Sequence, residues 1–320
     1  MVDTSIDTTN RIEIKSNGKL LISGEYFVLD GAKAFALPCK FGQHFTIQQQ
    51  ETEFKSEKIL HWKAFTKMNM LWLDAQIDIK TLSLLNEQSK EAIMLLNILK
   101  VCKDLNPTFL TDEHSISIEA KLDFPRSWGL GSSSTLIYFI AQWAKVNPYE
   151  LLEKTFGGSG YDIACASSDS PLIYTRNKVQ PLVEKVNFYP TFKDQLFFVH
   201  LNEKMNSRNA IQYYKNLDID KSSIISKINQ ITDAFLASKT IQEFEACMYQ
   251  HEDLISNTLS IDKVKDTVFS DYWGAVKSLG AWGGDFVIMS NATQTPEYFK
   301  SYLNERGFNT VLSYDEMIIH

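Results

Sequence analysis

The stretch PRSWGLGSSSTLIYFIAQW, residues 125–143, places two glycines and three serines directly before an apolar run. The segment before it, residues 114–124, alternates apolar and polar residues and predicts a strand that ends at Pro125. Residues 135–145 predict a helix. A glycine turn at the start of a helix exposes unpaired backbone N–H groups at the positive end of the helix dipole. The stretch therefore predicts an anion site, with phosphate as the usual ligand.

The three consecutive serines, Ser132, Ser133 and Ser134, have two alternative roles. One serine could cap the helix, which is the structural alternative. A run of three exceeds what capping needs, and a spare hydroxyl suits Mg²⁺ coordination. GLGSSS matches neither the Walker A pattern GxxxxGK[ST] nor the Rossmann pattern GxGxxG, and it lacks the GxSxG of a nucleophile elbow. P-loop, Rossmann and serine hydrolase assignments are therefore disfavoured.

Glycine is concentrated in a few places along this chain. Of 14 glycines, eight lie in three short stretches, at 129–131, 157–160 and 280–284. Glycine is useful where the backbone adopts positive φ or approaches a ligand closely. Each stretch alone could be an ordinary turn, but three together predict loops that surround a ligand.

Composition and charge exclude several classes of protein. The 320 residues are 44% hydrophobic and 22% charged, which is typical of a folded globular protein. The net charge of −7, without a basic block, argues against a nucleic-acid partner. The polar N-terminal residues resemble no secretion signal, and no apolar run is long enough to span a membrane. We expect a cytoplasmic protein with no membrane association.

Cysteines and histidines give no metal signature. Cys39, Cys102, Cys165 and Cys247 are far apart and form no CxxC, so buried free thiols are expected. The six histidines show no HExxH spacing, and His251 is predicted to be a helix residue.

The order of predicted elements indicates an α+β protein in two domains, residues 1–188 and 189–320. The first contains early strands and a helix at 87–105 that stops before Asn106-Pro107. The second begins with the strand QLFFVHL and continues with a helical region over 221–256. It then has a helix at 271–279, a glycine turn, the strand DFVIMS, and a last helix and strand.

Four motifs resemble those of the GHMP kinases, in the same order over most of the chain. PRSWGLGSSS resembles PxxxGLGSSA, and residues 16–38, SNGKLLISGEYFVLDGAKAFALP, resemble APGKxxLxGEHxVxxG. Residues 158–174 resemble the GSGFDxAxAxxGS segment of phosphomevalonate kinases, and residues 278–290 resemble GAKxTGAGGGDCxIA. The resemblance is closest to the phosphomevalonate and mevalonate kinase branch.

The resemblance implies a fold and an activity. The N-terminal domain would be like ribosomal protein S5 domain 2 and the C-terminal domain ferredoxin-like. The protein would be an enzyme that transfers a phosphoryl group from Mg-ATP to a small molecule. The favoured acceptor is phosphomevalonate or mevalonate, which would place the enzyme in isoprenoid biosynthesis. Oligomeric state, monomer or homodimer, is left open.

Individual roles follow from the same resemblance. Asp162 would be the catalytic base, and Lys19 would stabilise charge beside the γ-phosphate. ATP would be bound by Gly129, Leu130, Gly131, Ser132, Ser133, Ser134, Gly280, Ala281, Gly283 and Gly284. The substrate would contact Gly160, Tyr161, Lys204, Ser207 and Arg208, and the metal Ser133, Glu150 and Glu153. As structural alternatives, Asp162 could be a helix cap, and Lys19, Lys204, Ser207, Arg208, Glu150 and Glu153 could be solvated surface residues.

The chain departs from the motifs at a few positions. Trp282 stands where the third motif has glycine, and an indole is disfavoured on a path with positive φ, so we expect this loop to be rebuilt. Leu279 replaces Ser or Thr, and Tyr26 replaces the histidine of GEH. Two alternatives to a kinase therefore stay open, a non-catalytic ligand-binding sensor of the same fold and a diphosphomevalonate decarboxylase.

Overall fold

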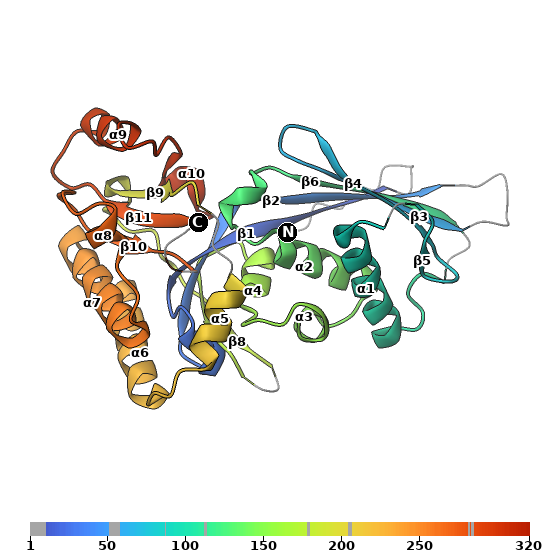
Figure 1. Cartoon of the computed structure of the whole chain (residues 1–320), viewed down its shortest axis with the longest axis horizontal. Coiled ribbons are helices and arrows are strands. Elements are labelled where there is room, and N and C mark those ends of the chain that lie inside the picture. Colours follow the sequence, from blue (N-terminus) through green and yellow to red (C-terminus); the bar gives the residue numbers. More distant parts are fainter. Residues whose placement is uncertain are drawn as a thin grey trace. The chain divides into compact units, whose positions relative to one another are not determined.

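The computed structural model describes residues 11–50, 58–86, 88–111, 114–177, 180–203, 207–280, 282 and 285–320. It confirms the predicted α+β class (Figure 1). The chain forms two compact units. Unit 1 contains Met1–Gly18, Phe41–Arg126 and Gly131–Ser167, and unit 2 contains Lys19–Lys40, Ser127–Leu130 and Ser168–His320.

These units are not continuous in sequence. Strands β1 (Arg11–Ser23) and β2 (Ala34–Gln50) each run from one unit into the other. The boundary predicted at 188/189 lies within unit 2, because residues 19–40 and 168–188 pack with the C-terminal part of the chain.

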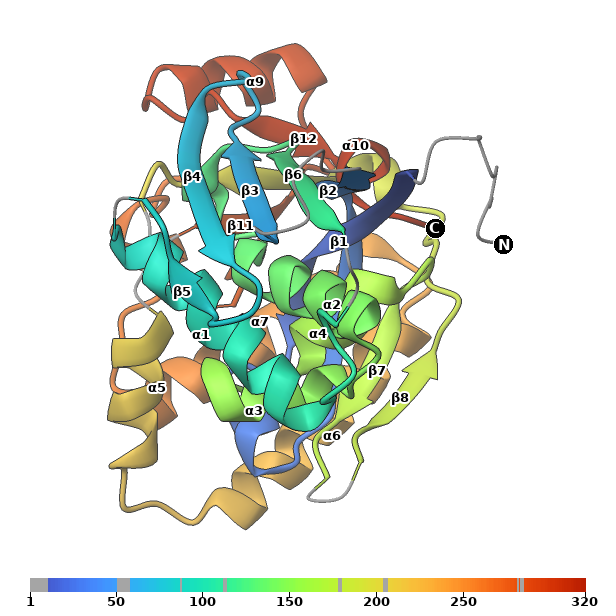
Figure 2. The ribbon, with the colours of Figure 1, turned by 90° about the vertical axis from the view of Figure 1, so that its right-hand side faces the viewer.

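Unit 1 is a sheet with helices on one face (Figure 2). The strand order is β5-β4-β3-β6-β2, in which β3 and β6 are parallel and the other neighbours are antiparallel. The remaining elements are β3 (Ile59–Phe65), β4 (Leu71–Asp78), β5 (Ser83–Leu84), β6 (Ser115–Leu122), α1 (Lys90–Leu105), α2 (Ser132–Ala144), α3 (Pro148–Thr155) and α4 (Tyr161–Ser167).

The core of unit 1 fixes helix α2 against this sheet. Phe139 of α2 stacks on Phe45 of β2 with ring centroids 3.9 Å apart, and Trp62 of β3 packs edge-on against both rings. All three side chains are buried. Aromatic side chains bury large apolar areas and prefer defined geometries, so this cluster sets the position of the α2 start.

Unit 2 contains a ferredoxin-like sheet. Its chain order is β-α-β-β-α-β and its strand order β10-β11-β9-β12 is antiparallel throughout, which confirms the expected C-terminal fold. The elements are β9 (Leu196–His200), α5 (Ser207–Lys215), α6 (Lys221–Ala237), α7 (Ile241–Leu259), α8 (Val264–Thr267), β10 (Val276–Ser278), β11 (Phe286–Ser290), α9 (Pro296–Asn304), β12 (Val311–Ser313) and α10 (Tyr314–Met317).

Further short elements complete unit 2. Strand β7 (Leu172–Thr175) pairs with the first residues of β2 and with β8 (Leu182–Lys185). Short 3-10 helices form at Phe27–Asp30, Arg126–Trp128 and Lys193–Gln195. Helices α6 and α7 lie side by side (Figure 1). Within the described residues, no helix is long and apolar enough to cross a membrane.

Two sequence-based predictions about unit 2 need correction or refinement. The helix predicted at 271–279 is wrong, since these residues contain strand β10, which pairs with β11. Lys277 and Ser278 are buried in it, so their polarity did not mark a solvent-exposed face. The helical region at 221–256 is two helices, because Thr240 starts α7 with a capping box that includes Glu243. The four cysteines are buried and free, as expected.

Candidate active site

Two helices of unit 1 begin in the same way, directly after a glycine in the left-handed region. Gly131 (φ 89°) precedes α2, and Gly160 (φ 92°) precedes α4. In each case the glycine carbonyl accepts hydrogen bonds from the amides three and four residues later. A side chain disfavours this backbone conformation, so glycine suits both starts. The first amides of α2 have no acceptor within the helix and can bind an external anion.

A hydrogen bond joins the starts of these two helices. The hydroxyl of Ser134, in the first turn of α2, donates to Oδ2 of Asp162, in the first turn of α4. Ser134 is buried and Ser133 is exposed. Thr135 donates in turn to Oε1 of Gln43 at 2.8 Å. The predicted carboxylate and the predicted anion-binding helix therefore meet within unit 1.

The serines do not cap α2. Its N-cap position is Gly131, and no side chain caps it. Ser132, Ser133 and Ser134 are the first three helical residues, one position too late for the capping role. The hydroxyl of Ser134 instead donates to Asp162.

Tyr149 of α3 lies close enough to Asp162 for their charges to interact. Burial raises the pKa of Tyr149 to about 12, and the charges of Cys165 and Asp162 add to this increase. The phenol is therefore neutral at physiological pH.

In unit 2, Lys19 holds the first residues of the glycine loop. Its ammonium donates to the carbonyl of Gly129 at 2.9 Å, and its backbone amide donates to the carbonyl of Leu130 at 3.1 Å. Trp128 anchors the same loop by packing edge-on against Phe286 of β11 at 5.6 Å. Lys19 is thus half-buried against the loop and not a solvated strand residue.

The third motif is the loop of the β10–β11 hairpin in unit 2. Leu279 donates to the carbonyl of Phe286 at 3.1 Å and closes the loop. A Cβ added to Gly280 (φ 73°) would lie 4.0 Å from Nζ of Lys19, so the backbone of Gly280 is a neighbour of that ammonium. A Cβ on Gly129 would lie 2.1 Å from Oδ2 of Asp285. The carboxyl of Asp285 therefore packs directly on the glycine loop.

The sequence has a bulky indole where the motif has glycine, but Trp282 does not adopt the left-handed backbone conformation that the motif suggests. It is not among the residues with positive φ, and its indole is buried in a cluster with Tyr26, Phe27 and Tyr214. Its backbone amide donates to the hydroxyl of Tyr26 at 3.3 Å. The side chain that breaks the motif is thus a core residue, and it ties the third motif to the first.

The remaining predicted residues have mixed outcomes. Glu150 and Glu153 are exposed on α3, and Glu150 pairs with Lys154 at 3.9 Å. Lys204, Ala281, Gly283 and Gly284 lie outside the described residues, as do the side chains of Ser207 and Arg208 at the start of α5. Gly160 and Tyr161 lie at the start of α4, beside Asp162.

Metal binding by protein side chains alone is not indicated. In the described ranges, no group of three or more His, Cys, Asp or Glu side chains could hold a metal ion. Hydroxyl and carboxylate oxygens such as those of Ser133 and Asp162 suit Mg²⁺, which is commonly bound by one or two carboxylates together with substrate phosphates and water.

Sequence reasoning missed several residues near these loops. Asp285 follows the last motif glycine and could have been found from the motif itself, GGGDC. Glu25, His251, Glu252 and Lys277 are charged or titratable yet fully or almost fully buried in unit 2, and no local pattern reveals this.

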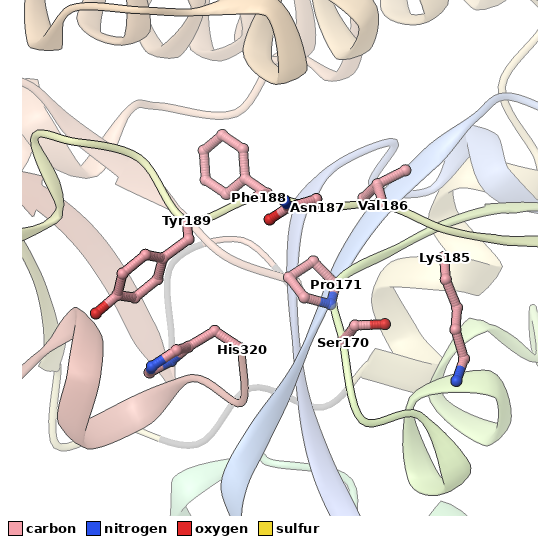
Figure 3. A pocket seen from close by; sticks show the side chains of 8 residues that line it. All are labelled: Ser170, Pro171, Lys185, Val186, Asn187, Phe188, Tyr189 and His320. Carbon is pink, nitrogen blue, oxygen red and sulfur yellow. The ribbon is translucent and has the colours of Figure 1, made fainter.

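A separate cavity of about 450 Å³ lies in unit 2 (Figure 3). It is lined by Ser170, Pro171, Lys185, Val186, Asn187, Phe188, Tyr189 and His320. The ring of Tyr189 stacks on that of His320 at 4.3 Å, and the lysine is already paired with Asp169 at 2.7 Å. This mainly apolar cavity does not suit a triphosphate, and none of the predicted site residues lines it.

Comparison with known proteins supports the fold. No protein-family model and no curated protein matches the sequence. Among solved structures, mevalonate kinase from Methanococcus jannaschii is similar, with 18% identity, 97% of this chain and 98% of that chain covered, and a TM-score of 0.69. Phosphomevalonate kinase from Streptococcus pneumoniae, in complex with phosphomevalonate and AMPPNP, has 16% identity, coverage of 94% and 99%, and a TM-score of 0.68. Galactokinase from Lactococcus lactis, complexed with galactose, has 13% identity, coverage of 98% and 94%, and a TM-score of 0.67. The chain has the fold of the GHMP kinases.

Proposed function

We propose that the protein transfers the γ-phosphoryl group of ATP to a hydroxyl or phosphate oxygen of a small molecule. The observation that carries the proposal is the Ser134–Asp162 hydrogen bond, which puts a carboxylate beside the amides at the start of α2. Phosphoryl transfer needs an anion cradle and a group that orients the acceptor, because positioning and charge stabilisation supply most of its catalysis.

The chain's own residues supply these functions. Backbone amides of residues 131–133 bind phosphate oxygens. The acceptor oxygen attacks the γ-phosphorus, the bond to the bridging oxygen of ADP breaks, and Asp162 accepts the acceptor's proton. Lys19, which already donates to Gly129, stabilises negative charge on the transferred group. A positioned general base of this kind contributes about 10²- to 10⁴-fold to the rate.

Magnesium would enter with the nucleotide. When bound, it neutralises charge on the phosphates. Ser133 is the donor we propose, since its side chain is exposed whereas Ser134 is buried and bonded to Asp162. Glu150 and Glu153 remain the candidate acidic ligands.

For the acceptor we propose mevalonate or phosphomevalonate. The support is the resemblance of residues 16–38 and 158–174 to the motifs of that branch, together with the similar structures of mevalonate and phosphomevalonate kinases. The galactokinase is almost as similar in structure, so the fold by itself does not select the acceptor.

The test is an acceptor panel with purified protein, Mg²⁺ and ATP labelled at the γ-phosphate. Mevalonate, phosphomevalonate, homoserine and galactose are compared for ADP release and for label in the product, with Asp162→Asn as the inactive control. Diphosphomevalonate is tested in parallel for release of CO₂, the sign of a decarboxylase. Folded protein that transfers label to none of them, and binds an acceptor without AMPPNP by calorimetry, would instead be a sensor.

A further inference from the structure

A cluster of four ionisable side chains is buried in unit 2. Nζ of Lys277 lies 2.6 Å from Oε1 of Glu25 and 4.0 Å from Oε1 of Glu252. Nε2 of His251 lies 3.1 Å from Oε2 of Glu25. The exposed fraction is 0% for Glu25, His251 and Lys277 and 2% for Glu252. Charged groups are rarely buried to this degree unless they are paired, so the cluster requires an explanation.

The cluster is close to electrically balanced at neutral pH. Burial would raise the pKa of Glu25, but the Lys277 ammonium and the contacts with His251 hold it below its ordinary value. Burial, together with the charge of Lys277, lowers the pKa of His251. Burial raises the pKa of Glu252 to about 8. One cation then faces one anion, with a neutral imidazole and a neutral carboxyl beside them.

Three members of the cluster also contact the backbone near a motif through their side chains. Lys277 donates to the carbonyl of Ser278 at 2.8 Å, and Oε1 of Glu252 accepts from the amide of Ser278 at 3.2 Å. Nε2 of His251 lies 3.3 Å from the amide nitrogen of Gly24, so it accepts from Gly24 in one tautomer and donates to Glu25 in the other. The side chains of the cluster therefore form hydrogen bonds with the backbone of two turns, one at Gly24 and one after Ser278.

Both turns lead to residues of the glycine loops. Gly24 follows β1, which carries Lys19, and Ser278 ends β10, two residues before Gly280. Gly280 is the neighbour of the Lys19 ammonium, as the 4.0 Å separation from a built Cβ indicates. The bond from Trp282 to the hydroxyl of Tyr26 joins the same two segments a second time.

We propose that Lys277 is a positioning residue for phosphoryl transfer, which holds the end of β10 against the Glu25 turn and thereby keeps Gly280 beside Lys19. The inference rests on the proposed function for the catalytic role of Lys19. Its structural part, the coupling of the two turns, does not depend on that function. Displacing one member of a fully buried ion pair is costly, because it separates a buried charge from its partner.

The test compares three variants in the whole protein. Lys277→Met removes the ammonium and leaves the buried Glu25 with only His251 of the cluster as a partner. Glu25→Gln/Lys277→Met removes both charges. Glu25→Gln alone keeps an acceptor for the Lys277 ammonium. Lys263→Met is the matched control, since its ammonium also pairs with a carboxylate, Asp253 at 2.9 Å, but near the surface.

Two readouts are needed at a temperature at which each variant is folded. Hydrogen exchange is followed at the amides of Lys19 and Leu279, which bond to Leu130 and Phe286. Steady-state kinetics give kcat and the KM for ATP with the acceptor found in the panel. A displacement of about 1 Å in such a site costs on the order of 100-fold in rate.

We expect the double variant to recover the Tm lost in Lys277→Met, while kcat stays about 100-fold low and exchange at both amides stays fast. Glu25→Gln should lose Tm but keep kcat within about threefold, because the hydrogen bond that positions the turns persists. Wild-type kcat and exchange in either methionine variant at position 277 would overturn the inference. If the wild type phosphorylates no acceptor, the proposed function fails, and hydrogen exchange still decides whether Lys277 couples the turns.

Discussion

The two carboxylates that follow the motif glycines have opposite surroundings. Asp162 in unit 1 is half-buried and accepts a hydrogen bond from the hydroxyl of Ser134. Glu25 in unit 2 is fully buried and contacts an ammonium and an imidazole. A serine hydroxyl carries no charge, whereas the charge of Glu25 is paired within the protein. Position after a glycine turn thus does not by itself distinguish a carboxylate proposed for catalysis from a structural one.

The largest effect is expected from removing the charge of Asp162. Asn at this position can still accept from Ser134, so fold and nucleotide binding should persist while kcat falls by about 10²- to 10⁴-fold. Turnover and AMPPNP affinity are measured on the same preparation. Near-normal turnover in Asp162→Asn would mean that the charge of Asp162 is not needed for catalysis. A loss of AMPPNP affinity as large as the loss of kcat would mean that Asp162 is a structural residue, like Glu25.

The next effect concerns the close approach of Asp285 to the glycine loop. Gly129→Ala should destabilise the fold by about 2 to 4 kcal/mol, because it adds both backbone strain and a steric clash. Gly157→Ala is a matched control, since its φ is also 65° but nothing lies within 4 Å of the added Cβ. Strain alone should cost about 1 to 2 kcal/mol there. Denaturant unfolding of both variants measures the difference, and equal losses would mean that Asp285 moves aside freely.

A smaller effect should appear in the pH dependence of stability. The pKa of Glu252 is near 4.5 ordinarily and about 8 in the folded protein, so the folded state binds more protons between these values. Its contribution to the free energy of unfolding therefore falls as pH rises. Burial lowers the pKa of His251 from 6.5, so the imidazole is neutral in the folded protein above this pH, and in the unfolded chain it is largely neutral above about pH 7.5. Between pH 6.5 and 8 we expect a loss of about 2 kcal/mol in the wild type that Glu252→Gln abolishes.

The measurement is urea unfolding of both proteins at several pH values. Subtracting the Glu252→Gln curve from that of the wild type removes groups outside the cluster. Parallel curves would show that Glu252 is ionised in the folded protein, and the charge balance inferred for the cluster would be incorrect.

The smallest effect is expected at the surface pair of Lys263 with Asp253 and Asp266. Lys263→Met should change the free energy of unfolding by about 0.2 to 1 kcal/mol, because exposed ion pairs are screened by water. Lys277→Met should cost about 3 to 5 kcal/mol by the same urea assay, since it removes the cation from a buried ion pair. Similar losses of unfolding free energy in Lys263→Met and Lys277→Met would contradict the distinction between an exposed and a buried ion pair.

The sequence predicted those parts of the site that local chemistry encodes. Gly131 before α2 could be inferred in this way, because a turn at a helix start restricts the residue type. The roles of Asp162 and Lys19 were instead predictions from the resemblance to the GHMP kinase motifs. The capping role for the serines was wrong by one position, since Gly131 itself occupies the N-cap. The helix predicted at 271–279 was wrong, because the polar residues Lys277 and Ser278 are buried in strand β10.

By itself, the sequence determined the α+β class and the glycine loops, since these follow from hydrophobic periodicity, backbone sterics and short-range spacing. Only the tertiary structure decided that Lys277 and Glu25, 252 residues apart in the chain, form one buried pair. It also decided that the side chain of Trp282 is buried in a hydrophobic cluster of unit 2. Burial and pairing are properties of the three-dimensional arrangement, and the free energy of a charge depends on both.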